Sequence, residues 1–277
     1  MNKKLLLTLV LLVFFVLSLS ADSFIPFMET EQGTIGLLHH TYQNGATSDE
    51  FDFIKQGGQN NLYPFSRYSV GARIGKAHRI WLTYQPLLLN TTVEIPTGEV
   101  ITIGGKDFEG AMAMSYGFPF YRATYTYDVL RNQEEAYLGI GLALQIRNAS
   151  IQFCEIDGGD CFVSQNVGLV PALAIYSEYH FPFGMTLSAD IIGSYANSAY
   201  FNGADYPFEG SILDASLRIA YDLPEGFSLF ANARFFGGTA EGESENDSTN
   251  WTDPPEDYTK NNIASLTFSL GLAWQMQ

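Results

Sequence analysis

The strongest constraint in this sequence is a strict period of two near its C-terminal end. The apolar members of the final run are Leu266, Phe268, Leu270, Leu272, Trp274 and Met276, with small or polar residues between them. Such alternation is typical of a β-strand with one apolar face. Ten runs of this kind lie near residues 33–43, 66–75, 79–93, 110–127, 136–153, 162–179, 185–200, 210–222, 227–240 and 262–276. The sequence therefore predicts an all-β protein of about ten strands.

The connections between these runs alternate in length. Short connections lie at 76–78, 128–135, 180–184 and 223–226, and longer polar ones lie at 44–65, 94–109, 154–161, 201–209 and 241–261. An even number of strands joined in this way predicts an antiparallel up-and-down transmembrane barrel. A sheet that spans lipid must close on itself, because its backbone polar groups cannot be left unpaired there. We expect short periplasmic turns, long acidic extracellular loops and both termini in the periplasm.

The N-terminal segment has the pattern of a secretory signal peptide. Lys3 and Lys4 precede an apolar stretch over 5–19, and the small residues Ser20 and Ala21 follow. This stretch is shorter than the ~20 residues that a membrane-spanning helix requires. We predict a signal peptide over residues 1–21 and a single barrel domain over 22–277. Without the peptide, Lys plus Arg falls from 14 to 12 against 30 acidic residues. The net charge then changes from −16 to −18, which argues against nucleic acid as a partner.

The placement of arginine indicates which face of the sheet points inward. Seven of the eight arginines share the register of small and polar neighbours: Arg67, Arg73, Arg79, Arg122, Arg147, Arg218 and Arg234. Glu178, Asp190 and Asp214 fall on the same face. A soluble barrel would show the reverse pattern, with apolar residues inside and charges outside. We therefore expect a lumen of paired arginines and carboxylates inside an apolar belt that contacts lipid.

These features resemble the small outer-membrane β-barrel proteins of Gram-negative bacteria, the broad OmpA-like and porin-like superfamily. The resemblance rests on the signal peptide, the period-two strands, two aromatic-flanked turns over 179–185 and 221–227, and the final segment 270–274. It implies a location in the bacterial outer membrane, contact with lipid and lipopolysaccharide, and insertion by the barrel assembly machinery. One departure is that such barrels usually end on an aromatic residue, whereas this sequence ends on Gln277.

Two further groups of residues are candidates for covalent or metal chemistry. Cys154 and Cys161 predict a disulfide, because an exported protein meets an oxidising compartment. Metal binding by the two thiolates is the alternative, but no histidine lies nearby to complete a zinc site. Carboxylates suit Ca²⁺ or Mg²⁺, and the weak candidates in the last long loop are Glu241, Glu243, Glu245 and Asp247. An acidic run is more often a solvated loop, and we predict no other cofactor.

The sequence shows no catalytic constellation. A count of ten strands also resembles the omptin proteases, but their paired Asp and Asp-His motifs have no match at the outward strand ends here. We expect a non-enzymatic barrel with a structural or surface role. In a second version of this hypothesis, the barrel also contains a narrow arginine-lined channel for small solutes. The alternatives are an outer-membrane hydrolase that uses His39 or His40, and a soluble exported barrel that binds a ligand inside.

Overall fold

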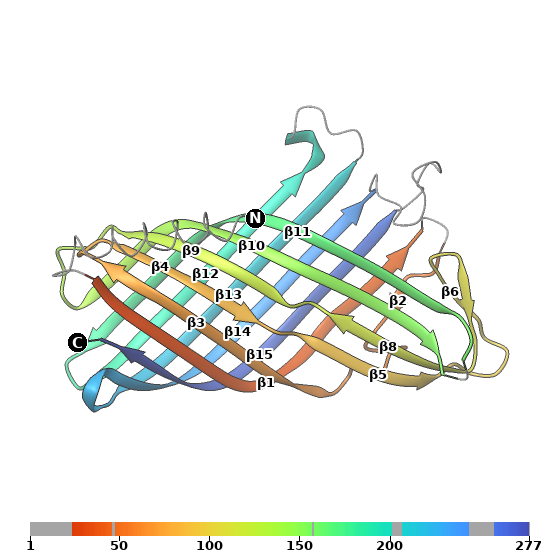
Figure 1. Cartoon of the computed structure of the whole chain (residues 1–277), viewed down its shortest axis with the longest axis horizontal. Helices are drawn as coiled ribbons and strands as arrows, with labels where there is room; N and C mark the ends of the chain where they lie inside the picture. Colours follow the sequence, from red (N-terminus) through yellow and green to blue (C-terminus); the bar gives the residue numbers. More distant parts are fainter. Residues whose placement is uncertain (1–23, 46–47, 157, 201–206, 244–257, 277) are drawn as a thin grey trace, which may run out of the picture.

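Ten antiparallel strands close into a barrel (Figure 1). The computed structural model describes residues 24–45, 48–156, 158–200, 207–243 and 258–276, so the predicted signal peptide lies outside the described residues. In order around the barrel the strands are β1 (Phe24–Asn44), β3 (Leu62–Ile74), β4 (His78–Gln85), β9 (Phe120–Asp128), β10 (Ala136–Glu155), β11 (Cys161–Phe181), β12 (Met185–Asn197), β13 (Phe208–Asp222), β14 (Phe227–Gly242) and β15 (Thr259–Gln275). Pairing of β15 with β1 closes the barrel. The predicted all-β up-and-down fold is confirmed.

Two predicted strands are each divided into two. The run expected over 79–93 forms β4 and β5 (Leu88–Glu94), and the run over 110–127 forms β8 (Ala111–Gly117) and β9. Pro86 and Pro119 lie at the two interruptions. Because proline has no backbone N–H for a sheet ladder, each strand ends beside it. The remaining short strands are β2 (Phe51–Asp52), β6 (Ile101–Ile103) and β7 (Lys106–Phe108).

The two ends of the barrel differ, and we call them the turn end and the loop end. Short turns join β3 to β4, β11 to β12 and β13 to β14 at the turn end, where Phe24 and Gln275 also lie. In the β11–β12 turn, Gly184 has a φ of 77°, a conformation that glycine adopts without strain, and its N–H donates to the carbonyl of Phe181. The long connections lie at the loop end.

Large apolar side chains are exposed on the outward face of the barrel near the turn end. Leu82, Leu142, Leu217 and Leu270 are 57%, 63%, 56% and 71% exposed. Soluble proteins rarely expose a continuous apolar surface of this kind, whereas membrane barrels carry an apolar band about 25 Å tall. We call this surface the apolar belt. No helix in the described ranges is long and apolar enough to cross a membrane.

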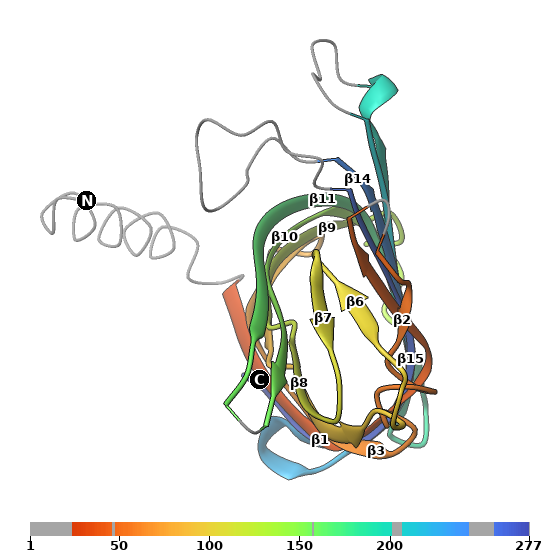
Figure 2. The same cartoon turned by 90° about the vertical axis from the view of Figure 1, so that its right-hand side faces the viewer.

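Beyond the belt, the barrel separates into two sheets toward the loop end. Pairing of β3 with β4 stops at Tyr68 and Tyr84, and pairing of β11 with β12 stops at Leu173 and Gly193. One sheet contains β5, β8, β10 and β11, and the other contains β12 to β15 with β1 and β3. Figures 1 and 2 show the two sheets diverging, with the β6–β7 hairpin across the opening at the loop end.

Candidate functional site in the lumen

Six of the seven predicted arginines form ion pairs inside the turn-end half of the lumen. They are Arg67, Arg73, Arg79, Arg122, Arg218 and Arg234. Their carboxylate partners are Glu29, Glu31, Glu178, Asp190 and Asp214. Most of these pairs join strands that are not neighbours and therefore cross the lumen. Arg67–Glu31 and Arg234–Asp214 are the exceptions, because each joins two adjacent strands of the wall.

Asp214 lies at the centre of the most buried group. Its carboxylate accepts hydrogen bonds from Arg122, at 2.6 Å, and from Arg234 on the neighbouring β14. Arg122 also donates to the amide oxygen of Gln145, at 2.6 and 3.0 Å, and Arg234 donates to that of Gln85, at 2.7 Å. The five side chains come from β4, β9, β10, β13 and β14 and are all buried. We call them the Asp214 network.

Glu178 of β11 organises a second group nearer the turn end. Arg73 donates to both of its carboxylate oxygens, at 2.7 and 2.6 Å, and Arg79 donates to one of them at 2.8 Å. Arg79 also lies 3.6 Å from Glu29, which pairs with Arg218 at 3.0 Å. Two strands, β9 and β10, separate β4 from β11 in the barrel order, so this group also reaches across the lumen.

The third group joins Arg67 to Glu31 and Asp190, at the longer distances of 3.7 and 3.8 Å. Asn232 and Ser269 donate to Glu31 at 3.0 and 2.7 Å. A cavity of about 20 Å³ lies beside Arg67 and Asp190 and has room for about one water molecule. The described inward side chains therefore pack closely around Arg67 and Asp190 and leave a space of that size between them.

Sequence reasoning missed Glu29 and Glu31, because the first strand was expected near residue 33 and instead begins at Phe24. Both residues lie on the same face of the strand as Gly33 and Ile35, two residues apart in turn. Continuing the period-two alternation toward the N-terminus would have found them. The missed amides Gln85 and Gln145 share the inward register of the arginines as well. Gln145 meets Arg122 directly opposite it on the neighbouring β9, whereas Gln85 on β4 meets Arg234 on β14 because the barrel closes.

The seventh predicted arginine, Arg147, lies apart from these networks. It is half-buried on β10, in the inward register but closer to the loop end. In the part of the chain that the structure describes, Arg147 makes no ion pair, and its Nε packs against Gly168 of β11. The structure thus brings six of the predicted arginines together with the carboxylates, and it does not bring Arg147 to them.

The loop-end half of the lumen is apolar. Its buried residues on the barrel wall include Ile35, Phe65, Tyr116, Phe153 and Phe236. The first two long connections, expected to be polar loops outside the barrel, fold inward and add buried apolar side chains, namely Phe51, Phe53, Ile95, Ile103 and Phe108. That expectation is corrected for these two loops. Their apolar residues are spaced irregularly, so periodicity could not reveal that they are buried.

The two candidate catalytic histidines lie in different surroundings. His39 is exposed, and His40 is fully buried in the apolar half. The His40 ring stacks on Phe53 with centroids 4.2 Å apart, meets Tyr116 edge-on at 4.3 Å, and its Nδ1 lies 2.7 Å from Oε1 of Gln59. A hydrolase dyad needs a nucleophile beside the histidine and a group that orients it. The contacts of His40 are two aromatic rings and an amide, which do not supply these roles.

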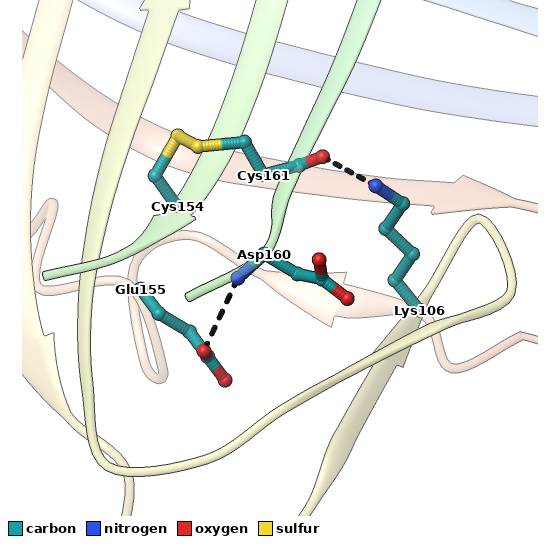
Figure 3. The surroundings of a disulfide bond; sticks show 5 residues. All are labelled: Lys106, Cys154, Glu155, Asp160 and Cys161. Carbon is teal, nitrogen blue, oxygen red and sulfur yellow. Dashed lines mark hydrogen bonds between the residues drawn. A yellow bond between two sulfur atoms is a disulfide. The ribbon is translucent and has the colours of Figure 1, made fainter. Parts of the chain in front are cut away.

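Cys154 and Cys161 form the predicted disulfide across the ends of β10 and β11 (Figure 3). Nζ of Lys106 donates to the carbonyl of Cys161 at 2.7 Å, which joins this rim to β7 of the inserted hairpin. Within the same turn, the backbone N–H of Asp160 donates to the carboxylate of Glu155 at 3.3 Å. The disulfide and the Asp160–Glu155 bond close the tip of the β10–β11 hairpin, and the Lys106 bond joins this tip to the segment that fills the lumen.

The candidate cation loop is described only in part. Glu245 and Asp247 lie outside the described residues. Oε1 of Glu241 accepts a hydrogen bond of 2.7 Å from the hydroxyl of Tyr258, and this bond raises the pKa of Tyr258 to about 12. Among the described residues, Glu241 and Glu243 belong to no group of three or more side chains able to hold a metal ion.

Comparison with known proteins supports the fold. No protein-family model matches the sequence, and no curated protein is similar to it in sequence. Among solved structures, the outer membrane protease OmpT from Escherichia coli is similar, with a TM-score of 0.58 and 8% identity over 91% of this chain and 97% of that one. A Pseudomonas aeruginosa FadL homologue has a TM-score of 0.39 at 10% identity, over 91% of this chain and 90% of that one. Ail of Yersinia pestis has a TM-score of 0.30 at 9% identity, over 91% and 99%. At 8% identity, the likeness to OmpT extends to the fold alone, which is that of an outer-membrane β-barrel.

Proposed function

We propose that this protein is an integral barrel of the bacterial outer membrane with a closed lumen and a structural or surface role. The turn end and both termini face the periplasm, and the loop end faces the outside. The apolar belt contacts lipid and lipopolysaccharide, and the barrel assembly machinery inserts the chain after the peptide 1–21 is removed. The apolar belt around a charged interior supports this placement, because each surface then meets a solvent that suits it.

The observation that carries the closed state is the Asp214 network. Its three charges are almost completely buried and come from strands β9, β13 and β14, so they hold the wall together across the lumen. Separating such a pair leaves an uncompensated buried charge, at a cost of about 3–5 kcal/mol. The apolar half above it is filled as well, and a solute would have to displace both layers.

Two measurements test this proposal. The first is migration on a gel of the detergent-extracted membrane fraction, with and without boiling. A heat-dependent shift is expected for a closed membrane barrel, and recovery in the soluble periplasmic extract would contradict the placement. The second is conductance of the purified barrel in planar bilayers. We expect no steady conductance, and an ohmic, always-open pore would contradict the closed lumen.

A second candidate function is a gated channel that prefers anions. The turn-end networks contain six arginines and five carboxylates, which leaves an excess of positive charge inside. A positively charged constriction favours anions. Brief openings with anion selectivity in the bilayer recordings would support this candidate, whereas cation-selective openings would exclude it.

A further inference from the structure

One edge of the barrel wall lacks a neighbouring strand above the apolar belt. β11 pairs with β10 from Cys161 to Tyr179, but it pairs with β12 only from Leu173 to Phe181. β12 itself continues to Asn197 alongside β13. Among the strands that the structure describes, residues 161–172 of β11 therefore have a partner on one side only. Both views show β11 and β12 diverging toward the loop end (Figures 1 and 2).

Pro171 explains where the pairing stops. Oγ of Ser194 on β12 donates to the carbonyl of Pro171 at 2.7 Å, so the backbone of Pro171 faces β12. In an antiparallel pair, the N–H and C=O of one residue point toward the same neighbour, and proline has no N–H to offer. Val163, Gln165, Val167 and Leu169 share the parity of Pro171. Their backbone donors and acceptors consequently face the side that has no strand.

The matching gap on the other side of the split barrel is filled by the chain itself. There, β5 pairs only with β8, but the segment that contains Phe51 and Phe53 folds into the space. Gly58 of this segment packs against Val93 of β5. The β6–β7 hairpin closes the opening beside it (Figure 2). The described part of the chain supplies no comparable segment for the edge of β11, so the two gaps are not equivalent.

The side chains along the free edge remain apolar where the adjacent strand becomes polar. Val163, Val167 and Leu169 are 49%, 72% and 63% exposed. On β10, Val163 and Val167 face Gln152 and Asn148 in the register. On β10 the apolar belt has therefore already given way to polar residues, whereas β11 still has apolar side chains at the same height. Lipid does not account for such a row, since an unpaired strand edge is not stable in hydrocarbon.

Charge at the tip of the hairpin indicates which partner fits. Glu155 and Asp160 lie beside the start of β11, in the turn that joins it to β10. Lys106 contacts the carbonyl of Cys161 at this rim. The two carboxylates at this tip, in a chain of formal net charge −16, favour a basic partner.

We propose that residues 163–169 of β11 form a docking edge for an extended basic peptide segment of another protein, which adds to the sheet as a strand. Backbone hydrogen bonds supply the affinity in this mode of recognition, and alternate side chains supply the specificity. Apolar side chains of the segment contact Val163, Val167 and Leu169, and basic ones lie near Asp160. The inference rests on the proposed membrane placement, because that placement puts the edge outside the lipid.

The test uses the full barrel in detergent micelles and a fluorescent, end-capped nine-residue peptide in which valine and lysine alternate. The control peptide has the same sequence with methyl groups on the backbone nitrogens of alternate residues. It keeps every side chain and charge but lacks those backbone N–H donors. Anisotropy should show saturable binding of the first peptide, and about tenfold weaker binding of the methylated one. Equal binding of both peptides, or no binding of either, would overturn the docking edge.

Variants locate the binding. Val167→Pro removes one N–H of the free edge and should weaken binding about tenfold, whereas Val167→Thr keeps that donor and should weaken it less. Asp160→Asn should weaken binding of the lysine peptide, and the control Glu134→Gln at the turn end should not. Retained heat-dependent migration verifies that each variant is folded. If the barrel self-associates and Val167→Pro abolishes this, the edge binds a second copy of the chain and the proposal is overturned. The proposed closed membrane barrel would not be affected by that result.

Discussion

The two halves of the lumen are closed in different ways. At the turn end, six arginines and five carboxylates cross the barrel in hydrogen-bonded ion pairs. At the loop end, the same wall is apolar inside, and two loops supply aromatic and aliphatic side chains that fill it. Most strands run through both halves, although Pro86 and Pro119 interrupt the wall at β4–β5 and β8–β9. The inward residues therefore differ more between the halves than the course of the backbone does. One barrel can therefore combine a polar interior with an apolar core.

The stability of the turn-end half should depend on intact ion pairs, and that of the loop-end half on the volume that apolar side chains fill. A buried ion pair is costly to break because the remaining charge has no solvent. A buried apolar side chain contributes according to the area and volume that it fills. The turn-end half should therefore be sensitive to the loss of one charge, and the loop-end half to the loss of bulk.

The largest effect is expected for Asp214→Asn. The substitution leaves Arg122 and Arg234 buried without a negative partner, and we expect the free energy of unfolding to fall by about 3–5 kcal/mol. Urea denaturation of the barrel folded into lipid vesicles measures this. The control Asp222→Asn, on the exposed last residue of β13, should change stability by less than about 0.5 kcal/mol. A similar small change for Asp214→Asn would mean that the network does not hold the wall.

The next largest effect concerns the bulk of the apolar half. Phe53→Ala removes a fully buried ring and should destabilise the inserted segment by about 3 kcal/mol. Since this segment can open without unfolding the barrel, the change should appear as faster amide exchange at residue 53. In the wild-type protein, the N–H of this residue donates to the carbonyl of His40. Phe183→Ala, on an exposed turn residue, serves as the control and should not alter that exchange. An unchanged exchange rate in Phe53→Ala would contradict a packed apolar half.

A smaller effect is expected from the disulfide. Replacing Cys154 and Cys161 by serine should lower the stability of the hairpin tip by about 2 kcal/mol, because the bond restricts the open state of a short loop. The rate of limited proteolysis between residues 155 and 160 measures this change, and it should be higher in the serine variant. Reduction of the wild-type protein should have the same result, and cutting that is no faster after reduction would show that strand pairing alone holds the tip.

The smallest effect is expected where a polar pair lies inside the apolar half. His40→Phe combined with Gln59→Leu replaces both partners of one buried hydrogen bond, and the change in stability should stay under about 1 kcal/mol. Gln59→Leu alone leaves His40 unpaired and should cost more, about 1–3 kcal/mol. Urea denaturation of the wild-type protein, the single variant and the double variant gives the three free energies of unfolding to compare. A large loss in the double variant would show that this half also depends on a polar contact.

Much of the fold follows from local patterns in the sequence. The alternation over 266–276 and over 136–153 predicts β15 and β10, because a strand places successive side chains on opposite faces. The parity of Arg122 and Arg234 places them on the inward face for the same reason. The pattern fails where an interruption is small, and Pro86 and Pro119 divide strands that the alternation reads as continuous.

The sequence by itself determined the strands, their facing and the disulfide, since each depends on residues close together in the chain. Only the tertiary structure decided that Asp214 meets Arg122 although three strands separate β9 from β13 in the wall. The same holds for the place of Glu29 and Glu31 in the lumen and for the inward direction of Phe51 and Phe53. The free edge of β11 belongs to this second group as well. Pro171 marks it in the sequence, but the edge exists because β12 follows β13 away from β11. Period and composition act over a few residues, whereas closure of the barrel brings together residues that no local pattern relates.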